Sequence, residues 1–209
     1  HPTPITIWGY ADTAAGPAQL PGPTIIANEG ETLVVILHND LGETTSLAFR
    51  GFPVAPDTVG VGAGGDNALA PYSLPNVQPG TYMYEAGLTT NGPRQVAMGM
   101  FGVLIVRPAM GAGYAYNDAN TAFDTEAILV LSEIDPAFNA NPATFDMTLY
   151  APKYFLINGQ AYPDTAEIPA VAGDKVLIRY LDGGLQFHSM GLLGLGQTII
   201  GGGGSQLAH

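Results

Sequence analysis

The sequence predicts an all-β protein. Short runs of alternating or β-branched residues recur along the 209 residues, and turn signals separate them. The 28 Gly and 17 Pro residues are spread along the chain instead of gathered into repeats, which favours many short strands joined by tight turns. Only about one turn near Pro93–Met98 has a helical pattern. Together these observations indicate β-sandwich architecture.

The predicted strands are segments rich in aliphatic, aromatic and β-branched residues. They cover Thr3–Trp8, Thr24–Ala27, Thr32–His38, Ser46–Phe49, Gly80–Glu85, Phe101–Val106, Ala127–Glu133, Tyr154–Ile157, Lys175–Leu181 and Gln197–Ile200. Turn signals such as Pro21-Gly22-Pro23 and Asn158-Gly159 lie between them. The Gly-rich stretch Gly60–Ser73 is predicted to be an ordered surface loop.

An internal similarity predicts two domains. Residues 28–37 resemble residues 171–180, because each segment is a Gly turn, an acidic residue and an aliphatic strand. The separation is domain-sized, which predicts two related sandwiches in tandem, over residues 1–110 and 125–209, with a linker over 111–124. The alternative is that β-proteins repeat this pattern by chance.

The second predicted sandwich is short. Only 36 residues follow Gly173, whereas roughly 77 residues of the first unit follow Gly30. We therefore expect the second sandwich to lack its last strands, which leaves unpaired edges and an uncovered core. A partner strand, a second chain or a lost C-terminal portion could fill the gap.

Composition excludes several classes of function. The net charge is −12, so the clustered positive charge that nucleic acid and anionic membranes attract is missing, and no apolar run of about 20 residues predicts membrane insertion. Cysteine is absent, which excludes disulfides and thiolate metal sites. The chain begins at His1, which suggests a removed leader or an excised fragment. With the acidity and few lysines, this favours a secreted or cell-surface location, the periplasm included.

Several motifs resemble the multicopper oxidase family, whose domains are of the cupredoxin type. The segment Leu20-Pro21-Gly22-Pro23-Thr24-Ile25, followed by residues 29–33, is similar to the signature of the family's first domain. Residues 98–106 resemble the strand that closes that domain, and residues 154–159 resemble part of the next one. The resemblance implies two tandem cupredoxin-like Greek-key β-sandwiches, the second incomplete.

The resemblance also implies where copper ligands would lie. In such oxidases the first domain supplies two His-X-His pairs, and the matching positions here hold Ala48 and Arg50, and Glu85 and Gly87. Because all four imidazoles are missing, we expect no copper cofactor, no catalytic residues and no redox activity. Arg50 and Glu85 carry opposite charges on strands that face one another in the family, so we hypothesise that they form an ion pair. The alternative is drift at two exposed positions.

Four histidines remain. His188 has Met190 nearby, and Cu(I) accepts both residue types, but without a Cys or a second His this pair is a weak candidate metal site. A packed polar residue is the favoured interpretation of His188, and a structural one that of His38. His1 could chelate copper through its amino group and ring, yet the second His of such a brace is missing. His209, the fourth, is the last residue.

The remaining motifs support no catalytic chemistry. No Gly-X-Ser-X-Gly is present, and Gly201–Ser205 resembles either a flexible linker or a degenerate turn. The sequence therefore favours a non-catalytic, extracytoplasmic protein with a structural role, which forms a homo-oligomer or polymer through edge-strand completion. The first alternative is a fragment or subunit of a copper-dependent multicopper oxidase. The second is a binding module, with Gly60–Ser73, Tyr72, Tyr82 and Tyr84 as its surface.

Overall fold

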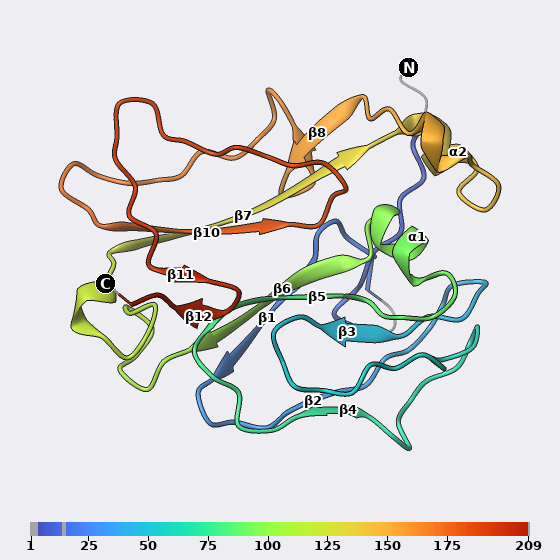
Figure 1. Ribbon diagram of the computed structural model, residues 1–209, viewed down its shortest axis with the longest axis horizontal. Coiled ribbons are helices and arrows are strands. Elements are labelled where there is room, and N and C mark those ends of the chain that lie inside the picture. Colours follow the sequence, from blue (N-terminus) through green and yellow to red (C-terminus); the bar gives the residue numbers. More distant parts are fainter. Residues whose placement is uncertain (1–3, 14–15, 209) are drawn as a thin grey trace.

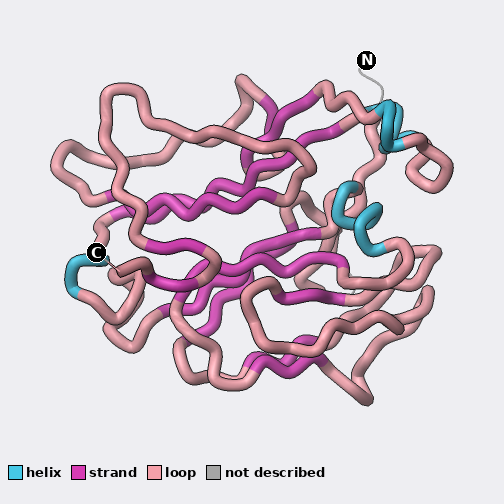
Figure 2. Tube along the Cα trace, in the orientation of Figure 1, coloured by secondary structure: helices cyan, strands magenta, loops and turns pink. Residues whose placement is uncertain are grey.

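Strands make up nearly all the regular structure of the chain (Figures 1 and 2). The computed structural model describes residues 4–13 and 16–208. The all-β prediction is confirmed. The strands are β1 Gly22–Asn28, β2 Leu33–Val35, β3 Leu47–Phe49, β4 Tyr72–Leu74, β5 Gly80–Ala86, β6 Phe101–Arg107, β7 Thr125–Ile134, β8 Tyr154–Ile157, β9 Gln160–Ala161, β10 Val176–Asp182, β11 Gly201–Gly202 and β12 Ser205–Gln206. The helices are α1 Gly92–Ala97 and α2 Pro136–Ala140, with single 3-10 turns at Ala119–Thr121 and Met147–Leu149.

The first half contains a four-stranded sheet in the order β1-β6-β5-β3 and a separate β2-β4 pair. Strand β6 lies inside the sheet, parallel to β1 and antiparallel to β5, and is apolar up to its last residue, Arg107. Its alternate side chains point to opposite faces. Leu104 and Val106 enter a core with Leu74 and Tyr84, so that this core lies between the sheet and the β2-β4 pair.

The second half has a single four-stranded sheet, in the order β10-β7-β8-β9. Its Val130 packs with Phe101, Val103 and Ile105 of β6, so one face of this sheet is buried against the first half. In the described part of the chain, the only other strands after β10 are the two-residue β11 and β12. Apart from helix α2, Figure 2 shows most of the remainder of this half as long loops.

An ion network joins the two halves. The Glu126 carboxylate of β7 accepts hydrogen bonds of 2.6 Å from both terminal nitrogens of Arg107, and one of 2.7 Å from Arg179 Nε. Arg179 also donates to Thr81 Oγ1 of β5 at 2.6 Å. Burial raises the pKa of Glu126, but the hydrogen bonds from Arg107 and Arg179 outweigh it and hold that pKa below its usual value.

Three predictions about elements were wrong. The described residues of Thr3–Trp8 form no strand, because Pro4 lacks an N–H and the pairing there is limited to single contacts such as Trp8 N to Met98 O. The loop Gly60–Ser73 gives way at its end to β4, which pairs with β2. Gln197–Ile200 is not a strand, because the hairpin that follows it makes the pairing instead.

The glycines at 201–204 form the β11–β12 hairpin, not a flexible linker. Gly203 and Gly204 have φ of 58° and 85°, which favours glycine. A Cβ on Gly204 would lie 2.1 Å from the Tyr82 ring, and one on Gly201 would lie 2.1 Å from Tyr116 Oη. The hairpin therefore packs its backbone directly on aromatic side chains. Among the residues described, no helix has the length and apolar character that a membrane span requires.

Candidate functional site

The four positions implied by the resemblance lie at the edge formed by β3 and β5. Strand β3 pairs antiparallel with β5, and Ala48 is directly opposite Glu85. Arg50 follows the end of β3, where its N–H donates to Met83 O at 2.9 Å. Gly87 follows the end of β5, and its N–H donates to Ser46 O at 2.9 Å. The structure thus brings all four positions to one short piece of sheet.

Arg50 and Glu85 lie at ion-pair distance. Arg50 Nη2 is 2.5 Å from Glu85 Oε1, and the Arg50 side chain is 67% exposed whereas that of Glu85 is 7% exposed. The hydrogen bond with Glu85 raises the pKa of Arg50 above its ordinary value. Glu85 Oε2 is buried without a hydrogen-bond partner among the described residues. An exposed cation therefore neutralises a buried carboxylate and links the end of β3 to β5.

Position 87 has no space for a side chain. A Cβ built on Gly87 would lie 2.3 Å from Ser46 Oγ and 3.1 Å from the Leu47 carbonyl carbon. Ser46 is fully buried, and its hydroxyl donates to Asp57 O at 2.9 Å. An imidazole at this position would require the neighbouring strand to move.

The loop after β3 covers the same edge through Asp57. The Tyr72 hydroxyl donates to Asp57 Oδ2 at 2.7 Å and accepts from Leu47 N at 3.1 Å. Burial raises the pKa of Asp57, but hydrogen bonds from Tyr72 and from the N–H groups of Val59 and Gly60 outweigh it and lower that pKa. Asp57 is therefore held as a carboxylate that fixes the loop.

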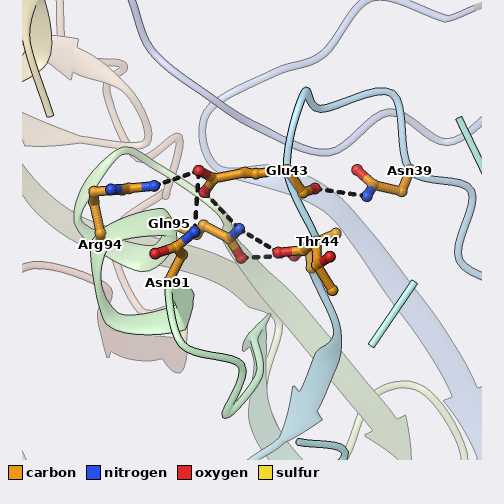
Figure 3. A network of polar contacts seen from close by, with 7 residues as sticks. Asn39, Glu43, Thr44, Asn91, Arg94 and Gln95 are labelled. Atoms are coloured by element: carbon orange, nitrogen blue, oxygen red, sulfur yellow. Dashed lines mark hydrogen bonds and ion pairs between the residues drawn. The ribbon is translucent and has the colours of Figure 1, made fainter. Parts of the chain in front are cut away.

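A second polar network flanks the edge on the side of α1 (Figure 3). Glu43 forms an ion pair with Arg94, and its other oxygen accepts from Gln95 Nε2 at 2.8 Å. Gln95 is fully buried, and its Oε1 accepts from Thr45 Oγ1 at 2.7 Å. Asn91 Nδ2 also donates to Glu43 Oε2, at 3.2 Å. These bonds fix α1 to the segment that leads into β3.

Sequence reasoning did not identify this network, because about 50 residues separate its partners. The only local signal was polarity. Glu43 precedes β3 in the sequence, whereas Arg94 and Gln95 lie in α1 after β5, and only the fold brings them together.

The other candidates lie apart from this edge. His188 Nε2 is 3.7 Å from Glu133 Oε2, and the His188 ring packs edge-on against Phe155 at 6.3 Å. Met190 is 42% exposed. His38 Nε2 is 3.2 Å from Asp40 Oδ1 on the surface. His1 and His209 lie outside the described residues.

The tyrosines suggested as a binding surface are mostly core residues. Tyr82 and Tyr84 are buried, and Tyr84 Oη donates to Pro23 O at 2.6 Å. Tyr72 packs against the same core, and its hydroxyl is engaged by Asp57. Burial raises the pKa of each of the three phenols. They form no exposed aromatic platform.

Sequence comparison identifies the first half. Residues 10–110 match the family model described as multicopper oxidase. This segment belongs to the multicopper oxidase family. No curated protein is significantly similar to the chain in sequence.

Solved structures of multicopper oxidases and copper nitrite reductases share the fold of the chain. The blue copper oxidase from Nitrosomonas europaea matches with 22% identity and a TM-score of 0.67, over 79% of this chain and 52% of that one. The multicopper oxidase mgLAC matches with 21% identity and a TM-score of 0.68, over 86% and 58%. A copper nitrite reductase from Nitrosomonas europaea matches with 22% identity and a TM-score of 0.59, over 86% and 65%.

At these identities the likeness shows the fold, which is of the cupredoxin type. The chain spans less than two thirds of the length of each of these three proteins.

The residues at the β3–β5 edge do not fit the copper sites of the family. Ala48 and Gly87 have no side-chain atom that could bind copper, and Glu85 Oε1 is already paired with the Arg50 guanidinium. No group of three or more His, Cys, Asp and Glu residues suited to a metal is found in the described ranges. At this edge, residues 10–110 therefore have an ion pair, Arg50–Glu85, and a loop held over the strands by Asp57.

Proposed function

We propose that the chain is a non-catalytic, extracytoplasmic member of the multicopper oxidase family with a structural role in self-assembly. The single observation that carries the proposal is the ion pair between the buried Glu85 carboxylate and the exposed Arg50, at positions where the family resemblance implies copper ligands. A site selected for copper needs open coordination positions and neutral imidazoles. This edge instead has hydrogen bonds that hold neighbouring segments together.

The second half supports the assembly part of the proposal. One face of its sheet is buried against the first half, and no second sheet of comparable size is present in the described part of this half. Most of the exposed large apolar side chains of the chain lie in this half, among them Phe155, Tyr162, Phe187, Leu193 and Leu195. Extended apolar surface of this kind marks an interaction site in soluble proteins. Completion by a neighbouring chain would give a homo-oligomer or a polymer.

The location outside the cytoplasm rests on composition. The chain has eighteen acidic and six basic residues and no cysteine. An acidic, thiol-free surface tolerates an oxidising compartment, since it has no group that such a compartment would oxidise to a disulfide.

Sedimentation velocity and negative-stain electron microscopy of the purified chain test the proposal. We expect discrete oligomers or filaments whose population rises with protein concentration, because association buries the apolar side chains of the second half. A stably folded monomer at high concentration would contradict the self-assembly role.

A second candidate is a subunit or fragment of a copper-dependent multicopper oxidase. The observation that favours it is coverage, since the chain spans 52% and 58% of two oxidases of similar fold. In that case other segments would hold the copper. Oxygen uptake with a phenolic reductant, measured on protein from its native source, separates the two candidates. Uptake that depends on added copper supports the oxidase, and uptake at the level of the buffer supports the structural role.

A further inference from the structure

A long loop without regular structure crosses the second half. This loop, residues 183–200, joins β10 to β11 and is called the strap below. Its beginning is anchored, because Gly183 N donates to Leu131 O at 2.9 Å and Leu185 N donates to Glu133 Oε1 at 2.6 Å. Near its end, Gln197 Oε1 accepts from Tyr180 Oη at 3.2 Å. Figure 1 shows the strap running from β10 around the outside of the second half to the hairpin.

The middle of the strap exposes apolar side chains almost completely. Phe187 and Leu193 are each 104% exposed, and Leu195 and Ile199 are 70% and 72% exposed. Between residues 186 and 194, no backbone N–H of the strap has a hydrogen-bond partner among the described residues. The strap is therefore held at both ends, and the His188 ring packs inward against Phe155, while the large apolar side chains around it are exposed.

The exposed area is of the size that an interface needs. A Phe side chain alone contributes about 150–250 Å² when fully buried, so the strap offers several hundred Å² of apolar surface. One side of a standard protein interface buries about 800 Å². Single scattered apolar residues are normal on a surface, but the strap gathers six exposed ones within residues 185–199, namely Leu185, Phe187, Met190, Leu193, Leu195 and Ile199.

The strap is also uncharged. No residue after Asp182 is Asp, Glu, Lys or Arg, although the chain as a whole has a net charge of −12. Two copies of such a chain repel one another through most of their surfaces. A contact between two straps brings no charged residue of either segment into the interface, and so it avoids both like-charge repulsion and the desolvation of ions.

We infer that the strap is a homodimer interface, in which the strap of one chain packs against the strap of a second copy about a two-fold axis. The inference rests on the proposed function, because it names the segment and the partner through which the chain assembles. Two-fold symmetry follows from the use of the same patch on both copies. Phe187 and Leu193 are the central apolar contacts, since they are the most exposed side chains of the strap.

Thiol cross-linking tests the inference directly, because the native chain contains no cysteine. Phe187→Cys and Leu193→Cys place single thiols in the strap. Leu69→Cys is the matched control, since Leu69 is 103% exposed but lies in the loop before β4, far along the chain from the strap. With a short bismaleimide we expect covalent dimers from the two strap variants and about tenfold less from the control. Equal cross-linking of all three variants would overturn the inference.

Charge substitutions provide a second, independent test of the strap interface. Leu193→Asp is expected to weaken dimerisation at least tenfold in sedimentation equilibrium, whereas Leu69→Asp leaves it unchanged. Raising NaCl from about 0.05 to 0.5 M should strengthen dimerisation of the native chain, because salt screens the repulsion between two acidic bodies. An oligomer that Leu193→Asp leaves intact would refute the strap interface but not self-assembly. A native chain that is monomeric at every salt concentration would refute both.

Discussion

Removal of Arg50 tests the role of its ion pair with Glu85. In Arg50→Ala the Glu85 carboxylate, 7% exposed, stays buried but loses its cation. Breaking a fully buried pair costs about 3–5 kcal/mol, whereas exposed pairs contribute about 0.2–1 kcal/mol. Because the Arg50 side chain is 67% exposed, solvent screens the interaction, and we expect an intermediate loss of about 2 kcal/mol in the free energy of unfolding.

A double-mutant cycle with Glu85→Gln isolates the pair. Glutamine keeps an acceptor for Arg50 and removes the buried charge, so Glu85→Gln alone should cost about 1 kcal/mol. The double variant should be about 1 kcal/mol more stable than the sum of the single effects predicts, because no buried charge remains unpaired.

Urea unfolding followed by circular dichroism, at one fixed protein concentration, measures these differences. In thermal unfolding, 2 kcal/mol corresponds to a decrease in Tm of about 4–8 °C for a chain of this size. Lys175→Ala controls for the loss of one positive charge from an acidic protein, since Lys175 is exposed, and should change stability by less than about 0.5 kcal/mol. Effects of Arg50→Ala and Glu85→Gln that add within about 0.3 kcal/mol would refute the reasoning.

Three further perturbations test other parts of the structure. Gly87→Ala should destabilise the chain by about 1–3 kcal/mol, because its Cβ would lie 2.3 Å from Ser46 Oγ. Gly42→Ala is the control and should be nearly neutral, since a Cβ there would have nothing within 4 Å. Similar urea midpoints for the two variants would contradict this expectation. Gln95→Ala should cost about 2–3 kcal/mol, since it leaves buried partners unsatisfied, and a loss below about 0.5 kcal/mol in the same assay would show that the network around Glu43 is dispensable. The pKa of Glu126 is lowered in the folded chain from its usual 4.5, so the ionised carboxylate adds stability above about pH 4.5, and this stability is lost as pH falls through the lower folded value. In Glu126→Gln the Tm should therefore decline less between about pH 5 and 3 than in the native chain. Parallel Tm profiles of the two proteins would exclude this linkage.

The sequence was sufficient for most strands and for the ion pair of Arg50 with Glu85. Strands β1, β6 and β10 contain aliphatic runs at or just after a glycine, β7 contains an aliphatic run, and β5 alternates tyrosines with other residues, so each of these patterns can be recognised within a few residues of sequence. The pairing of Ala48 with Glu85 follows from the strand order of the family, because alternate residues of neighbouring strands face the same side.

The elements that were not predicted depend on contacts distant in sequence or on short signals. Strand β4 follows a Gly-rich stretch and has only three residues, so its pairing with β2 determines it more than its own pattern does. Helix α2 has only five residues, yet Asp135 caps its N-terminus and Pro136 begins it, which is a readable start signal. The ion network of Glu126 joins four strands from both halves and leaves no local trace.

Copper content is the most direct test of the central claim, that the family fold is retained while its copper chemistry at the β3–β5 edge is replaced by an ion pair. Inductively coupled plasma mass spectrometry on protein purified from its native source, before and after incubation with copper and dialysis, gives the number of copper ions per chain. We expect well under one tightly bound copper per chain under both conditions. Stoichiometric copper that is lost in Glu85→Gln or Arg50→Ala would contradict it.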